Sequence, residues 1–172
     1  MTVILAIDPG TVRSAWLAFD TTTGTPVPGR RGIEPNADVL DLCRRIYLAG
    51  ILGWYVDAVV IEQVASYGMP VGETIFTTVL WCGRFAEAAS PLPVYLVPRM
   101  TVRMALCHSP RANDATVRQA LIDRFGGDSA IGRKATPGPL YGISTHLWSA
   151  LGVAVTWAGM EPDDQAATRL RP

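Results

Sequence analysis

Two acidic residues follow short apolar runs in the same way. Asp8 comes directly after Val3–Ile7, and Glu62 comes directly after Ala58–Ile61. Short runs rich in branched side chains are typical of buried strands. Open α/β sheets place their ligands beyond the carboxyl ends of the strands. If the two strands are neighbours, we therefore expect both carboxylates to project into one crevice.

Two carboxylates held this close repel each other unless a cation lies between them. Oxygen ligands without a cysteine favour Mg²⁺ or Mn²⁺ over zinc. Such ions suit phosphodiester hydrolysis, because two of them about 3.5–4 Å apart bind both the attacking and the leaving oxygen. Each acid alone is explained as well by a turn or a helix cap. At matching strand ends, the pair indicates a metal-dependent hydrolytic site.

The rest of the sequence predicts the elements that would hold these acids. An Asn at position 36 and an Asn or Asp at 113–114 are suited to capping helices. Two prolines within 25–33 make that strand an edge strand. Strands that alternate with helices indicate an α/β fold, a mixed sheet with helices on both faces. The predicted strands are 3–7, 14–20, 25–33, 57–62 and 93–97, and the predicted helices are 37–53, 71–89, 99–107, 114–125 and 145–158.

Composition indicates one ordinary domain. The chain has 172 residues, of which 49% are hydrophobic and 17% charged, enough for a full core. We expect the domain to cover residues 1–160, followed by a flexible tail at 161–172. The apolar runs are too short to span a membrane and no signal peptide is evident, so we expect a cytoplasmic protein. Three separated cysteines predict neither disulfides nor zinc, but small buried side chains: Cys43, Cys82 and Cys107.

The charge distribution is more informative than the net charge. A net charge of zero and a pI of about 6.7 argue against a nucleic-acid partner. However, all the basic residues except Lys134 are arginines, whose planar fork suits phosphate groups. A solvated surface is the alternative explanation for any one of them. Six lie between positions 99 and 133: Arg99, Arg103, Arg111, Arg118, Arg124 and Arg133.

Three motifs in order resemble those of the RuvC-type Holliday junction resolvases. Ile4–Gly10 (ILAIDPG), followed by an apolar strand ending at Asp20, resembles their opening. Val60–Val64 (VIEQV) resembles their second motif, and His146–Val155 (HLWSALGVAV) resembles their last. The resemblance covers about residues 3–158. It implies a ribonuclease H-like fold with a mixed five-stranded sheet, and the compact form of the chain suits a phage-type member.

This resemblance implies an endonuclease that resolves four-way (Holliday) or other branched DNA junctions with Mg²⁺ or Mn²⁺. Asp8 would bind metal and position the attacking water, and Glu62 would bind the same metals. His146 would bind metal or the scissile phosphate, or transfer a proton to the leaving oxygen. Its alternative is a capping or packing role in the first turn of the last helix.

Ser149 departs from the family pattern, which has an Asp three residues after the position of His146. A hydroxyl is a weaker ligand than a carboxylate for a hard cation. The site could use fewer ligands and more water, or another acid such as Asp114 or Asp128 could take part. The third explanation is a weak or inactive nuclease that still binds branched DNA.

The resemblance also predicts DNA contacts. The loop after Glu62 presents an aromatic ring to the junction in the family, and Tyr67 is the aromatic available here, with packing on the sheet edge as the alternative. Arg99 and Arg103 share a helix face, and Arg103 lies close to a basic DNA contact of the family. Arg111 lies in the adjoining loop.

A near two-fold symmetric junction requires two active sites, so the resemblance implies a homodimer. The predicted helices 37–53 and 74–88 carry apolar surface that could form the interface. Trp54, Tyr55 and Trp81 are candidates for it, although aromatic residues more often pack in cores.

Two other family assignments fit the sequence less well. The segment Asp8–Thr11 also resembles the first phosphate loop of the actin–hexokinase ATPases, but those need a second similar half, and 172 residues without a repeat leave no room. YqgF-type proteins of the same fold, linked to RNA processing, are shorter and lack the arginine-bearing segment. A non-enzymatic binder of DNA junctions is the alternative from another class.

Overall fold

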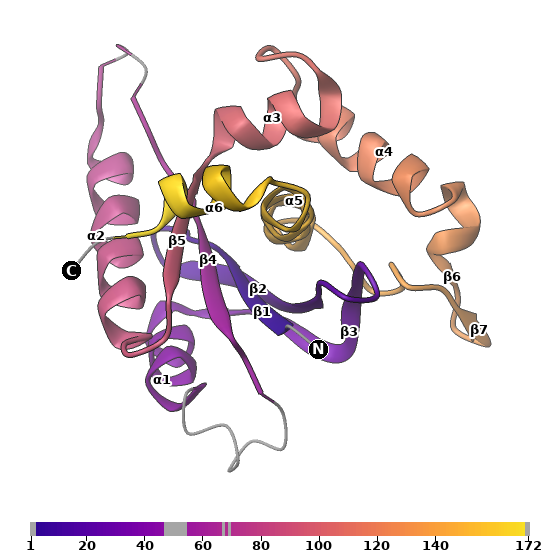
Figure 1. The fold of residues 1–172 in the computed structure, drawn as a ribbon, viewed down its shortest axis with the longest axis horizontal. Helices are drawn as coiled ribbons and strands as arrows, with labels where there is room; N and C mark the ends of the chain where they lie inside the picture. The colour runs from indigo at the N-terminus through magenta and orange to yellow at the C-terminus, as the bar shows by residue number, and fades with distance from the viewer. Residues whose placement is uncertain (1–2, 47–54, 67, 69, 171–172) are drawn as a thin grey trace.

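The computed structural model of this chain describes residues 3–46, 55–66, 68 and 70–170. A five-stranded sheet with the order β3-β2-β1-β4-β5 forms its centre (Figure 1). The strand β1 pairs antiparallel with β2 and parallel with β4, so the sheet is mixed, as predicted. The bounds are β1 Val3–Asp8, β2 Arg13–Asp20, β3 Thr25–Pro35, β4 Ala58–Gln63 and β5 Val94–Pro98.

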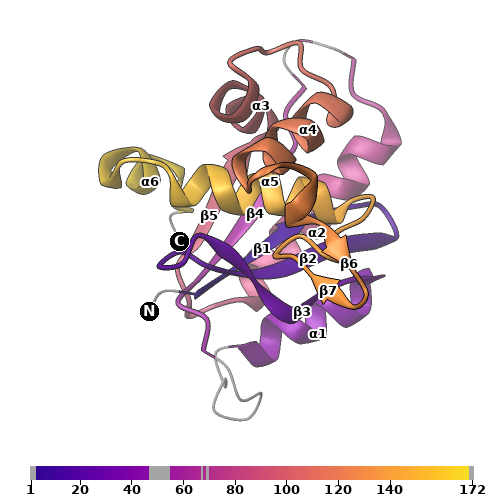
Figure 2. The same ribbon diagram turned by 90° about the vertical axis from the view of Figure 1, so that its right-hand side faces the viewer.

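Helices cover both faces of the sheet. The helices α1 and α2 pack together on one face, and α5 crosses the other against β1, β2 and β4 (Figure 1). The helices α3 and α4 pack on α5 and on each other, which Figure 2 shows from the side. This confirms the predicted fold class. The helix bounds are α1 Asn36–Arg45, α2 Glu73–Ala88, α3 Arg99–Cys107, α4 Asp114–Arg124, α5 Leu147–Ala158 and α6 Pro162–Thr168.

The pleat of the two central strands sends alternate side chains into two separate cores. Ile4 and Ala6 of β1, with Val60 of β4, pack on the α5 side. Leu5 and Val59 pack on the side of α1 and α2. Because side chains alternate with a period of two, the acids that end these strands continue the α5-facing rows. The alternation therefore decides on which face the site is built.

The helix α5 is apolar nearly all round because it lies between two layers. Every residue from 147 to 157 is buried except Ser149, which is half-buried. Gly152 allows α3 to approach, since a Cβ there would lie 3.1 Å from Cγ1 of Val102. A helix buried on all sides has little freedom to shift. Its first turn is thus a firm support for polar side chains at the sheet edge.

Several helix boundaries differ from the predictions; α2, for example, begins at Glu73 rather than at position 71. The predicted end of the first helix, at position 53, lies outside the described residues. Asn36 does not cap α1: Pro35 precedes the helix, and Asn36 is its first residue. The last helix begins at Leu147 rather than near position 145. Asn113 does cap α4, and its Oδ1 accepts a hydrogen bond from the Thr116 backbone N–H at 2.9 Å.

The segment between α4 and α5 contains short regular pieces. A 3-10 helix η2 at Gly127–Ala130 is followed by a small hairpin of β6, Gly132–Arg133, and β7, Thr136–Pro137. Of the three cysteines, Cys43 and Cys82 are buried and Cys107 is half-buried, and all three are free thiols.

The C-terminal segment is more regular than the expected flexible tail. The helix α6 begins at Pro162 and has Asp163 and Asp164 in its first turn, which are favourable residues at these positions. Beyond it, the Leu170 backbone N–H donates to the Val94 carbonyl at 2.8 Å, which attaches the segment to the edge strand β5. None of the helices in the described part of the chain combines the length and hydropathy needed to cross a bilayer.

Candidate active site

The two acids identified from the sequence lie side by side. Ile7 pairs with Ile61 across the parallel strands β1 and β4, so Asp8 and Glu62 leave these strands at the same level and on the same face. The side chain of Asp8 is 12% exposed and that of Glu62 is 6% exposed. The two carboxyl groups are close enough for each to perturb the pKa of the other. The predicted crevice with two carboxylates is therefore present.

Burial and mutual repulsion perturb both acids. Burial, the neighbouring Asp8 charge and the hydrogen bond with Asp8 raise the pKa of Glu62 to about 8. Burial also raises the pKa of Asp8, although the hydrogen bond with Glu62 and the positive charge of Arg99 oppose this. At neutral pH and without a cation, Glu62 therefore keeps a proton. A divalent cation bound by the two carboxyl groups would lower the pKa of Glu62, so that Glu62 would lose this proton.

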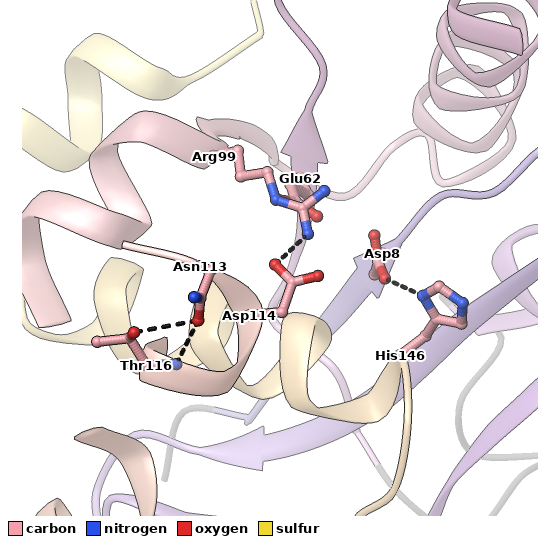
Figure 3. A network of polar contacts seen from close by, with 7 residues as sticks. All are labelled: Asp8, Glu62, Arg99, Asn113, Asp114, Thr116 and His146. Carbon is pink, nitrogen blue, oxygen red and sulfur yellow. Dashed lines mark hydrogen bonds and ion pairs between the residues drawn. The ribbon is translucent and has the colours of Figure 1, made fainter. Parts of the chain in front are cut away.

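The first turn of α5 flanks Asp8. Nδ1 of His146 lies 3.4 Å from Oδ2 of Asp8, while the imidazole is 75% exposed (Figure 3). Ser149, one turn later, is close enough to the Asp8 carboxylate for its hydroxyl to lower the pKa of Asp8. Thr145 precedes this pair with a φ of 39°, a left-handed conformation that costs a β-branched residue about 1–2 kcal/mol. The segment between α4 and α5 therefore has a strained backbone at the residue directly before His146, which lies beside Asp8.

A buried hydrogen-bond network fixes the turn that follows Asp8. Nδ2 of Asn36 donates to the Gly10 carbonyl at 2.9 Å, and its Oδ1 accepts from the Ser14 hydroxyl at 2.6 Å. The Ser14 hydroxyl in turn accepts from the Gly10 N–H at 3.1 Å. A Cβ at Gly10 would lie 2.1 Å from the Arg13 carbonyl, so the turn requires glycine there. Asn36 thus serves the site loop instead of the helix end.

A second charged network joins Glu62 to the neighbouring helices. Nε of Arg99, the first residue of α3, lies 3.5 Å from Oε1 of Glu62. Nη2 of the same guanidinium lies 2.8 Å from Oδ1 of Asp114, the first residue of α4 (Figure 3). Asp114 and Asp128 were both candidates for an additional acid. The structure brings Asp114 to the site, whereas Asp128 is exposed on η2 and away from it.

These groups border a cleft beneath α3, α4 and the start of α5. We call it the active-site cleft; its volume is about 380 Å³. A second hollow of about 420 Å³ runs from Asp8 and Glu62 past Ala65 to the start of α2. The polar and charged residues of the active-site cleft are Glu62, Arg99, Arg103, Asp114, Arg118, Thr145, His146 and Ser149.

The predicted DNA-contacting residues are placed differently from one another. Arg103 lines both hollows, and its Nε is buried without a hydrogen-bond partner in the described structure. Arg99 is engaged by two acids and is 43% exposed. Arg111 is exposed in the turn before α4 and lines neither hollow. Tyr67 lies outside the described residues.

Sequence reasoning did not single out Arg118 as a site residue. Its guanidinium lies 5.2 Å from the centre of the Trp148 ring, at the wall of the active-site cleft. Arg118 is four residues after Asp114, so the two share a face of α4. That spacing was visible in the sequence, but nothing in the sequence showed that this face borders the acids.

The donor set fits a hard divalent cation, with water supplying part of the coordination. Asp8 and Glu62 offer adjacent buried carboxylates, and Ser149 adds a hydroxyl oxygen. Asp114 on α4 is instead paired with the guanidinium of Arg99. In the described part of the chain, no three His, Cys, Asp or Glu side chains converge closely enough to form a complete metal site. The fit therefore rests on two carboxylates.

Comparison with known proteins supports the fold. No protein-family model and no curated protein matches the chain. The structure of RuvC from Thermus thermophilus matches with a TM-score of 0.61 and 21% identity, over 98% of both chains. The RuvC of the same organism in complex with a Holliday junction substrate matches with a TM-score of 0.62, at the same identity and coverage. The chain thus has the ribonuclease H-like fold of these proteins.

Proposed function

We propose that this protein is a metal-dependent endonuclease that cuts four-way or other branched DNA junctions. One observation carries the proposal: two adjacent buried acids, Asp8 and Glu62, end neighbouring strands and line one hollow together with Arg99 and Arg103. Paired buried carboxylates are costly unless they serve a cation or a proton transfer. The likeness to a RuvC structure that holds a Holliday junction substrate supports DNA as the polymer.

In this proposal the carboxylates of Asp8 and Glu62 hold Mg²⁺ or Mn²⁺. The bound ion would stabilise the charge that develops on the phosphate and favour attack by water. Asp8 would orient the attacking water, since its carboxylate can accept hydrogen bonds and lines the hollow that it shares with Glu62. His146, which is exposed beside Asp8, would deliver a proton to the leaving oxygen. The arginines at 103 and 118 would contact phosphates of the bound strand.

A homodimer is part of the proposal. Three apolar side chains on one stripe of α2 are exposed: Phe76 at 66%, Val79 at 49% and Leu80 at 62%. They are spaced three and four residues apart, so they form one face of the helix. A groove between this stripe and Leu40 of α1 continues the surface. Its burial against a second copy would place two active sites on one particle. Tyr55 is exposed and Trp81 half-buried, and Trp54 lies outside the described residues.

A junction-binding protein with weak or no cleavage is the second candidate. Two observations favour it: Ser149 stands where a carboxylate would complete the site, and the described residues do not form a three-ligand cluster. Both candidates use the same cleft and the same arginines. They differ only in whether a divalent cation leads to strand scission. A phage-type origin stays a prediction.

A nicking assay separates the two candidates. A labelled synthetic four-way junction is incubated with the protein and Mg²⁺ or Mn²⁺, and the products are resolved on a denaturing gel. We expect metal-dependent nicks that disappear in Asp8→Asn and persist in Asp128→Asn, whose side chain is exposed outside the cleft. Junction binding without nicks in either metal would establish the binding protein instead.

A further inference from the structure

The guanidinium of Arg99 already occupies a cation position in the site. It contacts a carboxylate of the sheet, Glu62, at 3.5 Å and a carboxylate of α4, Asp114, at 2.8 Å. These two acids come from elements far apart in the sequence, and Figure 3 shows them turned toward the same group. Arg99 thus holds together two oxygen donors that would otherwise repel each other.

Asp114 lies among the groups of the site and is not merely a partner of Arg99. It borders the active-site cleft together with Glu62 and Ser149, and it borders the hollow beside Asp8 together with His146. Its charge acts on both Asp8 and Glu62. As the first residue of α4, it is carried by a helix that packs on α5 and α3. The position of Asp114 is therefore set by the same core that sets the first turn of α5.

The two buried acids leave a divalent cation short of carboxylate ligands. Mg²⁺ prefers six oxygen ligands and Ca²⁺-like ions accept more, with carboxylates providing the charge. In this chain the start of α5 offers no carboxylate next to Asp8, only the imidazole of His146 and the hydroxyl of Ser149. A third carboxylate has to come from another element. Asp114 lines the active-site cleft with Glu62, and it lines the hollow beside Asp8 with Asp8 itself.

We infer that Asp114 is the third carboxylate ligand of the divalent cation, and that Arg99 holds it in reserve until the cation binds. On this inference, which rests on the proposed function, the cation held by Asp8 and Glu62 would also take Asp114 as a ligand, and the guanidinium of Arg99 would give up its contact with Asp114. The side chain of Asp114 is 76% exposed, so it has the freedom to turn from one partner to the other. Arg99, at 43% exposure, is then released toward the cleft and its phosphate.

An ordinary surface ion pair is the competing explanation for Arg99 and Asp114. Exposed pairs of this kind contribute little to stability, and a pair with no other role would leave metal binding unchanged. The two explanations make opposite predictions for metal binding without DNA. If Asp114 is a ligand and Arg99 competes with the metal, then removing the acid weakens metal binding and removing the arginine strengthens it.

The test is a titration of the protein with Mn²⁺ in the absence of DNA. Electron paramagnetic resonance measures the concentration of free Mn²⁺ at each step. We expect Asp114→Asn to weaken binding by at least about ten-fold, because even groups that only orient ligands are worth that much. Arg99→Gln should bind Mn²⁺ more tightly than the wild type. The matched control Asp128→Asn should bind as the wild type does.

The outcomes separate this inference from the proposed function. If Asp8→Asn loses Mn²⁺ binding but Asp114→Asn binds as the wild type does, the inference is overturned and the proposed function stands. If the wild type binds no Mn²⁺, or if Asp8→Asn binds it unchanged, both are overturned. Urea denaturation of each variant shows whether it is folded.

A second variant keeps the inference testable if Asp114→Asn is poorly folded. Ser149→Asp places a carboxylate on α5 beside Asp8, where it would supply the ligand that Asp114 otherwise provides. We expect Ser149→Asp to bind Mn²⁺ more tightly than the wild type. In that background, replacing Asp114 by Ala should cost less affinity than in the wild type. Equal costs in the two backgrounds would show that Asp114 and residue 149 do not serve the same ion.

Discussion

Asp8 and Glu62 end adjacent parallel strands at the same level, and both side chains point to the face that α5 covers. The parallel register and the two-residue pleat together produce this arrangement. A shift of one residue in either strand would turn one acid to the opposite face, against α1 and α2. The chemistry of the site thus depends directly on how β1 and β4 are paired.

Stability of the metal-free protein should depend on pH through Glu62. Its pKa is raised to about 8 in the folded state from an ordinary value of 4.5, so the folded protein keeps a proton that the unfolded chain releases in this range. The free energy of unfolding should therefore be highest below pH 4.5, as far as this group is concerned, and fall as the pH rises to about 8. Asp8, whose pKa is also raised, acts in the same direction.

Urea denaturation between pH 5 and pH 8.5, with a chelator present, measures this effect. Glu62→Gln should flatten the decline and be more stable than the wild type at the upper end of the range. Glu161→Gln, on the exposed surface before α6, is the control and should follow the wild type. Parallel curves for the wild type and Glu62→Gln would show that Glu62 does not hold the extra proton.

Arg103 should contribute one phosphate contact. Its buried Nε has no hydrogen-bond partner in the described structure, and its side chain lines both hollows beside the acids. We expect Arg103→Ala to weaken junction binding for every sequence tested. It should also reduce the slope of log affinity against log salt by about one unit.

Fluorescence anisotropy of a labelled junction at several salt concentrations provides the measurement. Arg124→Ala, in the last turn of α4 and outside the cleft, is the matched control and should keep the wild-type slope. An unchanged slope for Arg103→Ala would mean that this arginine contacts no phosphate.

The stripe of Phe76, Val79 and Leu80 should mediate dimerisation. A charge in the middle of an apolar interface is costly to bury, so Leu80→Glu should be monomeric at concentrations where the wild type is dimeric. Met104→Glu introduces the same charge at an exposed apolar residue of α3 and should leave the oligomeric state unchanged. Sedimentation velocity distinguishes the species. A wild type that is already monomeric, or a dimeric Leu80→Glu, would contradict this interface.

The fold was largely predictable because its signals are local. The apolar runs before Asp8 and Glu62 marked the central strands, and the fold class they implied is confirmed. The proline at position 98, which can open a helix, also predicted α3 at residues 99–107, as observed. The role of Asn36 was predicted wrongly, because a cap and a loop anchor look alike in sequence. Only the three-dimensional structure, in which β2 packs against the loop after Asp8, shows that the Asn36 amide forms hydrogen bonds with Gly10 and Ser14.

The site was predictable where the acids follow strands and unpredictable where helices meet. Because neighbouring strands bring Asp8 and Glu62 together, the residue types and their positions at the strand ends were sufficient to predict this pair. The contact between Arg99 and Asp114 depends on how α3 and α4 pack on α5, which no local pattern encodes. For the same reason, Arg118 and its position over Trp148 could not be assigned to the site from the sequence.

The most direct test of the account is an anomalous difference map from crystals soaked in Mn²⁺ and measured near the manganese absorption edge. The account predicts a peak between the carboxylates of Asp8 and Glu62, absent from crystals of Asp8→Asn grown and soaked in the same way. A soaked crystal with no peak at these two acids, or with the wild-type peak retained in Asp8→Asn, would contradict it.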